Sequence, residues 1–358
     1  MQQSLPEFDA ADLAACRDLL RGGSRTFFAA AHVLPRRVHE PATALYAFCR
    51  VADDAIDGAG GGAEALEPLH DRLDRAYDGR PAPHPADRAL AWVVARHTVP
   101  RALPAALLEG FAWDAQGRQY EDIGDLFAYA TRVAGTVGAM MATLMDARAP
   151  GTVARACDLG IAMQLTNIAR DVGEDARAGR LYLPRAWLRD AGIDPDDWLS
   201  RPAYSDALAG VIRRLLRTAD KLYARADAGI GQLPLACRPG IGAARRLYAE
   251  IGREVERRGC DSVSQRAVVS GARKARLLAR SLAAALPSAG IADEAVPQAQ
   301  FLVDAVAATR RAAPARSRLA LRPLAAIDDR AEWLIGLFER LEARDQAERA
   351  AQARRVTA

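Results

Sequence analysis

Apolar residues recur at helical spacing along most of this chain, and the alternation typical of strands is scarce. Four windows without proline are rich in Ala, Leu and Arg, which favour helices, and they cover residues 105–149, 151–183, 203–233 and 240–286. One apolar face consists of Leu208, Val211, Ile212, Leu215, Leu216 and Leu222. Hairpin turns between alternating strands are missing, since Asp57-Gly58 follows a helical pattern instead. The pattern therefore predicts an all-α protein of long helices.

No segment reads as a linker, and no fixed-period repeat is present, so residues 1–358 are predicted to form one domain. The stretch 288–314 is expected to be loosely held, and the tail 340–358 to form a charged, partly frayed helix.

Composition and charge narrow the class of protein. With 50% hydrophobic and 26% charged residues, the 358-residue chain has the proportions of a globular protein. A net charge of only +4 argues against a protein that works by binding nucleic acid. Five cysteines without paired spacing indicate reduced thiols, and neither a signal peptide nor an apolar run of spanning length is found. A cytoplasmic protein is expected.

Two helical segments carry stripes of acidic and polar side chains. In the first, Tyr46, Arg50, Asp53 and Asp57 are spaced by four, three and four residues, which places them on one helix face. In the second, Gln164, Asn167, Asp171 and Asp175 are spaced by three, four and four residues and so also lie on one helix face.

An aspartate pair alone is a weak signal, because like charges four residues apart cost a helix only about 0.2–0.5 kcal/mol. Asp74/Asp78 and Asp190/Asp194 have that spacing without a polar stripe around them and are interpreted as surface pairs. The two stripes differ because they run along largely apolar helices. Facing each other across a bundle, they would form a cage of oxygen ligands suited to Mg²⁺ and a diphosphate ester.

Two longer spaced patterns resemble the signatures of the squalene and phytoene synthase family. The first is Tyr129-Ala130 with Val133-Ala134-Gly135-Thr136-Val137-Gly138. The second comprises Leu159-Gly160, Gln164, Asn167-Ile168, Arg170-Asp171, Asp175, Arg180, Tyr182 and Pro184. The resemblance covers about residues 24–278, and the segments around Tyr46–Asp54 and Cys237–Gly240 are most similar to bacterial members that make phytoene.

This resemblance implies an isoprenoid-synthase helical bundle around a central cavity. Two geranylgeranyl diphosphates would be joined head to head through prephytoene diphosphate to phytoene, with Mg²⁺ or Mn²⁺ and without NADPH. Two alternatives stay open. A sister enzyme would use farnesyl diphosphate to make squalene, dehydrosqualene or presqualene diphosphate, and a non-catalytic relative would act as a binding protein, although such a relative should have lost some of the four aspartates.

The resemblance also assigns roles to individual residues. Asp53, Asp57, Asp171 and Asp175, assisted by Asn167, would hold the metal ions against the diphosphates. The residues implied in substrate binding are Ser24, Arg25, Thr26, Tyr46, Arg50, Gln164, Asn167, Arg170, Tyr248, Arg266 and Lys274. Ser24 is equally well explained as a helix N-cap after two glycines. The ligand role is favoured for Arg50, because a cation on the aspartate stripe can bind a carboxylate or a phosphate, and the alternative is an intrahelical ion pair.

A reacting carbocation needs a dry apolar tunnel, and small or flexible side chains beside the second stripe could line it. These are Ala134, Gly135, Gly138, Met141, Met145, Leu159 and Met163. Since a forty-carbon hydrocarbon barely dissolves in water, we expect peripheral membrane contact and hand-off to a phytoene desaturase.

Overall fold

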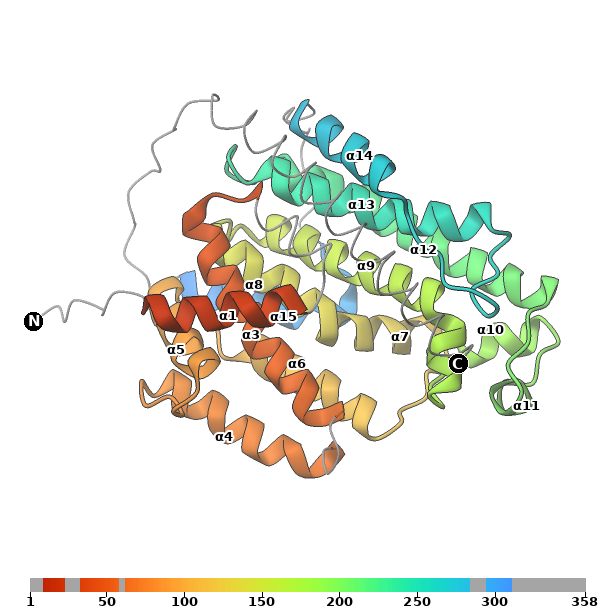
Figure 1. Cartoon of the computed structure of the whole chain (residues 1–358), viewed down its shortest axis with the longest axis horizontal. Helices are drawn as coiled ribbons and strands as arrows, with labels where there is room; N and C mark the ends of the chain where they lie inside the picture. The colour runs from red at the N-terminus through yellow and green to blue at the C-terminus, as the bar shows by residue number, and fades with distance from the viewer. Residues whose placement is uncertain (1–8, 23–32, 58–61, 284–293, 311–358) are drawn as a thin grey trace, which may run out of the picture.

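The structure is a computed structural model that describes residues 9–22, 33–57, 62–283 and 294–310. These residues form helices joined by turns, with no strand among them, so the predicted all-α class is confirmed (Figure 1).

The elements follow one another as a succession of helices. The first part comprises α1 (Ala10–Gly22), α3 (Arg36–Asp57), η1 (Gly62–Ala65), α4 (Leu66–Tyr77), α5 (Pro85–His97), α6 (Ala102–Ala115), α7 (Ile123–Ala130), the π-helical turn η2 (Thr131–Gly135) and α8 (Thr136–Leu144). The second part comprises α9 (Pro150–Arg177), α10 (Arg185–Asp190), α11 (Pro195–Ser200), α12 (Asp206–Ile230), α13 (Arg238–Arg257), α14 (Gly271–Ala283), η3 (Pro297–Ala299) and α15 (Gln300–Arg310).

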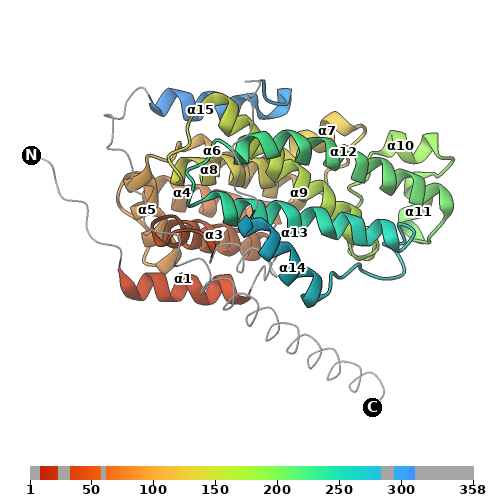
Figure 2. The same cartoon turned by 90° about the horizontal axis from the view of Figure 1, so that it is seen from above.

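Helix α9 is the centre of the bundle, between α8 and η2 on one side and α12 and α13 on the other (Figures 1 and 2). Its amino-terminal two-thirds consists mainly of small and apolar residues that are buried, together with the buried pair Arg155 and Asp158, whereas its last turns carry Asp171, Glu174 and Asp175. A single helix, α9, therefore contributes both to the hydrophobic core and to the predicted site.

Two glycines let the backbones of neighbouring helices touch. A Cβ at Gly160 would lie 2.2 Å from the carbonyl oxygen of Ala134, and one at Gly138 would lie 2.1 Å from that of Ala156. No side chain tolerates such distances, so the approach of α9 to η2 and α8 depends on glycine at both positions.

Helix α12 confirms the apolar face read from the sequence. The six residues of that face are all buried. Its start is fixed by Ser205, whose hydroxyl accepts a hydrogen bond from the Leu208 backbone N–H at 3.2 Å.

The expectation of a loosely held stretch at 288–314 is wrong for its described part. Residues 297–310 form η3, which packs on α7 and η2, and α15, which packs on α6, α8 and α9. Leu302 and Val306, one helical turn apart, are fully buried there. Proline and alanine around this short helix obscured its apolar stripe. The predicted tail 340–358 lies outside the described residues.

All five cysteine thiols are free. Among the described helices, none is both long enough and apolar enough to cross a bilayer.

Candidate active site

An apolar cavity of about 210 Å³ lies between α8, η2, α9, α12 and α13. Its wall includes six of the residues expected to line a tunnel: Ala134, Gly138, Met141, Met145, Leu159 and Met163. Gly135 is the exception. A Cβ built at this position would lie 3.5 Å from the Thr131 side chain and 3.6 Å from that of Ile161, and not in the cavity. The cavity lies beside the second stripe, where the tunnel was predicted.

Three predicted polar residues reach the wall of this apolar cavity. Gln164 and Asn167 come from α9, and Tyr248 comes from α13 on the opposite side. Asp171 and Asp175 follow Asn167 at successive helical turns of α9. The apolar space and the acidic end of α9 are therefore parts of one continuous region.

Asp171 is held between two arginines. Arg170 donates two hydrogen bonds to its carboxylate, at 2.7 and 2.5 Å, and Arg266, from the loop before α14, donates two more, at 2.8 and 3.2 Å. Burial raises the pKa of Asp171, but these two guanidinium groups outweigh it, so its pKa lies below the usual value. Asp171 is thus a firm carboxylate anion at neutral pH.

Asp175 behaves in the opposite way. Burial, reinforced by the negative charge of Asp171, raises its pKa to about 7, although Arg180 acts against the shift. A raised carboxyl pKa beside another carboxylate indicates negative charge that the protein leaves incompletely compensated.

Asp114 joins this region without having been predicted. Its carboxylate on α6 accepts hydrogen bonds from the Tyr129 and Tyr182 hydroxyls, each at 2.8 Å, and its charge contributes to the raised pKa of Asp175. The rings of Tyr129 and Tyr182 stack with centroids 5.2 Å apart. Tyr129 and Tyr182 belong to the two signatures, but Asp114 is the one aspartate of a largely apolar helix and gave no comparable signal.

Arg155 is a second residue that was not predicted, and it lines the cavity wall. Its guanidinium pairs with the fully buried Asp158 at 2.7 Å, and Arg225 from α12 pairs with the same carboxylate at 2.9 Å. Both arginines also donate to the Glu294 backbone carbonyl oxygen. This buried cluster therefore ties the segment before η3 to the cavity wall.

The first acidic stripe lies on α3, where Arg50 is an intrahelical partner. Its guanidinium contacts Asp54 at 2.6 Å and Asp53 at 3.6 Å. Asp54 is off the predicted stripe, but a residue four positions along a helix is as accessible to an arginine as one three positions along. The Asp53 side chain is 44% exposed. Asp57 is the last residue of α3, and its side chain lies outside the described part.

The remaining predicted residues belong to other segments of the chain. Tyr46 is half-buried on α3, and Lys274 is half-buried in the first turn of α14. Ser24, Arg25 and Thr26 lie outside the described residues. In the described part, the structure brings Gln164, Asn167, Tyr248, Arg170, Asp171 and Arg266 together around the carboxyl-terminal half of α9.

The donor set on α9 can be compared with the needs of a divalent cation. Within the described residues, no three or more acidic, histidine or cysteine side chains cluster closely enough to hold a metal on their own. Asp171, Asp175 and Asn167 offer oxygen donors, which Mg²⁺ prefers, and Mg²⁺ often binds through one or two carboxylates plus substrate phosphates. The uncompensated charge at Asp175 fits a cation shared with a diphosphate.

Comparison with known proteins identifies the relatives of this chain. A family model described as squalene/phytoene synthase matches residues 20–273. A phytoene synthase of Cereibacter sphaeroides is 49% identical over 94% of this chain and 95% of its own length. A phytoene synthase of Rhodobacter capsulatus is 50% identical over 89% of this chain and 97% of its own length.

Solved structures agree in fold. A dehydrosqualene synthase in complex with a ligand superimposes with a TM-score of 0.69 at 31% identity, over 76% of this chain and 96% of that one. A squalene synthase from Alicyclobacillus acidocaldarius gives a TM-score of 0.65 at 26% identity, over 70% of this chain and 94% of that one.

Proposed function

Because this chain belongs to the squalene/phytoene synthase family, we propose that its cavity joins two geranylgeranyl diphosphates head to head to give phytoene. It is a prenyltransferase of isoprenoid biosynthesis. Phytoene synthases that are 49% and 50% identical to it, over 95% and 97% of their own length, favour phytoene over a thirty-carbon product. The observation that carries the proposal is an apolar cavity whose wall includes Gln164 and Asn167, one helical turn before the Asp171 carboxylate that Arg170 and Arg266 hold.

The residues divide the work by position. Arg170 and Arg266 can exchange Asp171 for diphosphate oxygens, because guanidinium groups bind both anions in the same bidentate manner. Asp171, Asp175 and Asn167 would hold Mg²⁺ or Mn²⁺, which neutralises a departing diphosphate when bound. The apolar wall around Met141 and Met163 keeps water from an allylic cation. Asp53 and Asp57 are assigned to the metal by family resemblance.

A product assay tests the proposal directly. Protein supplied with Mg²⁺ and geranylgeranyl diphosphate, without NADPH, should release phytoene, because neither half-reaction requires a reductant. Extraction and chromatography of the hydrocarbons measures it, with farnesyl diphosphate as the competing substrate. A thirty-carbon product in place of phytoene would contradict the chain length, and folded protein that converts neither substrate would contradict the activity.

Binding of the metal is expected to depend on pH near neutrality. Mg²⁺ needs the Asp175 carboxylate, and the pKa of that group is raised to about 7 in the metal-free protein. Below pH 7 a proton competes, so the affinity for Mg²⁺ should fall about tenfold per pH unit and level off above pH 8. Calorimetric Mg²⁺ titrations between pH 6 and 8 measure this slope, and Asp175→Asn should abolish it. Equal affinities at pH 6 and pH 8 would rule out a role for Asp175 as a ligand.

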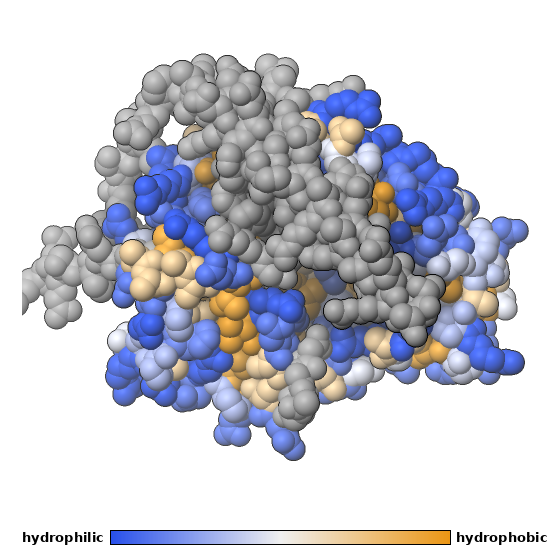
Figure 3. Space-filling view, in the orientation of Figure 1, coloured by the Kyte–Doolittle hydropathy of each residue, from blue (hydrophilic) through white to orange (hydrophobic). Residues whose placement is uncertain are grey.

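Peripheral membrane contact and transfer of product to a desaturase are part of the proposal. The described surface on the face of Figure 3 is mainly hydrophilic, with an apolar strip near its centre. Leu235, half exposed between α12 and α13, follows the cavity-lining Leu233 by two residues. The exposed Leu235 side chain, close in the chain to the cavity wall, supports a route by which a hydrocarbon product leaves the cavity without crossing water.

A further inference from the structure

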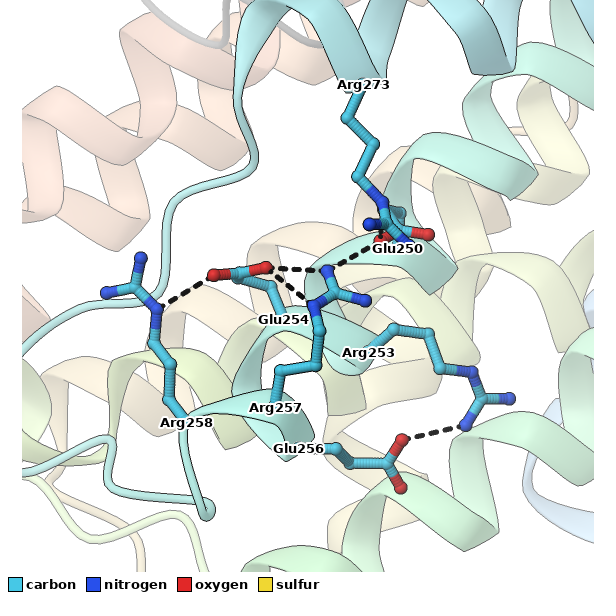
Figure 4. Close-up of polar contacts among 7 residues, drawn as sticks. All are labelled: Glu250, Arg253, Glu254, Glu256, Arg257, Arg258 and Arg273. Carbon is cyan, nitrogen blue, oxygen red and sulfur yellow. Dashed lines mark hydrogen bonds and ion pairs between the residues drawn. The ribbon is translucent and has the colours of Figure 1, made fainter.

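A network of ion pairs connects α13 to residues 258–270, the Arg266 loop, which leads to α14 (Figure 4). Glu254 accepts hydrogen bonds from Arg257 at 2.6 and 3.0 Å and from Arg258 at 2.9 Å. Arg258 in turn donates from Nη1 to the backbone carbonyl oxygen of Arg266 at 3.4 Å. Glu254 is therefore linked, through a single arginine, to the residue that clamps Asp171.

A second branch of the network reaches α14. The carboxylate of Glu250, whose side chain is only 10% exposed, accepts from Arg257 at 2.7 Å and from Arg273 at 2.5 Å. Arg273 directly precedes Lys274, so both ends of the segment that carries the two cations are fixed to α13.

The opposite side of the Arg266 loop rests on α9 at Gly173, two residues from Asp171. The Gly173 N–H donates to the Ser262 carbonyl oxygen at 2.9 Å, and Arg177 donates to the Val263 carbonyl oxygen at 3.2 Å. A Cβ at Gly173 would lie 2.5 Å from the Val263 carbonyl oxygen and 2.7 Å from its Cα. The loop can approach α9 this closely only because residue 173 has no side chain.

We propose that Glu254 and Gly173 are positioning residues, which place Arg266 at the acidic end of α9 and thereby set the affinity of the site for a diphosphate. This inference rests on the proposed function, because it takes the diphosphate as the ligand of Arg266. An arginine held from both sides loses less freedom when it binds an anion than one on a loose loop, so more of the contact appears as affinity.

Binding of inorganic pyrophosphate in the presence of Mg²⁺, measured by calorimetry, tests the proposal without requiring turnover. Arg266→Ala should weaken binding about tenfold, through loss of charge-assisted hydrogen bonds. Glu254→Gln should weaken it roughly threefold, the scale of an exposed ion pair. In the double variant, binding should equal that of Arg266→Ala alone, because Glu254 acts only through Arg266.

Glu256→Gln is the matched control. Glu256 is also on α13 and also pairs with an arginine, Arg253 at 2.9 Å, but this pair makes no drawn contact with Glu254, Arg257 or Arg258 (Figure 4), and Arg253 pairs in addition with Asp220 of α12 at 3.0 Å. Its affinity for pyrophosphate should equal that of the unmodified protein. Gly173→Ala, which displaces the loop from the other side, should weaken binding at least as much as Glu254→Gln.

The outcomes distinguish failure of the positioning role from failure of the proposed function. Unchanged affinity in Glu254→Gln and Gly173→Ala, or losses in the double variant that simply add, would overturn the positioning role. If the unmodified protein itself fails to bind pyrophosphate with Mg²⁺, the proposed function is contradicted instead.

Discussion

Replacing Asp171 by alanine is expected to lower kcat/KM on the order of 10³-fold, the scale for loss of one group that stabilises departing charge. The reason is local, because the variant loses a predicted metal ligand and leaves Arg170 and Arg266 without the anion that orients them. Steady-state kinetics with geranylgeranyl diphosphate measure the effect.

The fold should survive this substitution. The hydrogen bonds of the carboxylate go to two arginine side chains and not to the helix backbone, so circular dichroism should still show the helical content of the unmodified protein. Asp190→Ala removes an aspartate that is 70% exposed on α10 and should retain full activity. Near-normal turnover in Asp171→Ala, or an equal loss in Asp190→Ala, would refute the assignment of Asp171.

Gly160→Ala is expected to destabilise the protein by about 3 kcal/mol, a cost at the upper end of ordinary overpacking. The added methyl group would meet the Ala134 carbonyl oxygen at 2.2 Å, and backbone cannot move aside as a flexible side chain can. Thermal unfolding monitored by circular dichroism should show a melting temperature lower by roughly 5–10 °C.

Gly210→Ala gives the corresponding control inside α12. Nothing lies within 4 Å of a Cβ built at Gly210, so this change should be neutral or stabilise by up to about 1 kcal/mol, the intrinsic helix preference of alanine. Similar destabilisation in both variants would show that helix propensity or the unfolded chain, rather than contact between α9 and η2, decides the result.

The helical fold could be predicted because burial imposes a period on each long helix. The face of α12 is an example, since Leu208, Ile212 and Leu215 are apolar in the sequence and buried in the structure. Helix α15 was missed because its eleven residues offer only three turns of pattern beside alanine and proline. Short helices that depend on tertiary packing carry little information of their own.

The candidate site was predictable where its residues share one helix. Gln164, Asn167 and Asp171 follow from the spacing on α9, but the meeting of Asp171 with Arg266 joins positions ninety-five residues apart. Asp114 was not predictable, because its partners come from α7 and from the segment after α9. Which of two nearby aspartates Arg50 would contact was equally open, since both are within reach on a helix.

The backbone contacts at Gly138 and Gly160 also limit which residues can be changed to alter the chain length of the product. One wall of the cavity is formed where α8 and η2 meet α9, and larger residues at these glycines would separate the helices before they reshaped the cavity. The opposite wall consists of side chains such as Ile230 from α12 and Ile241 from α13, which can be exchanged individually. Laboratory evolution towards shorter or longer isoprenoids should therefore leave Gly138 and Gly160 unchanged and alter lining side chains such as Met141, Ile230 and Ile241.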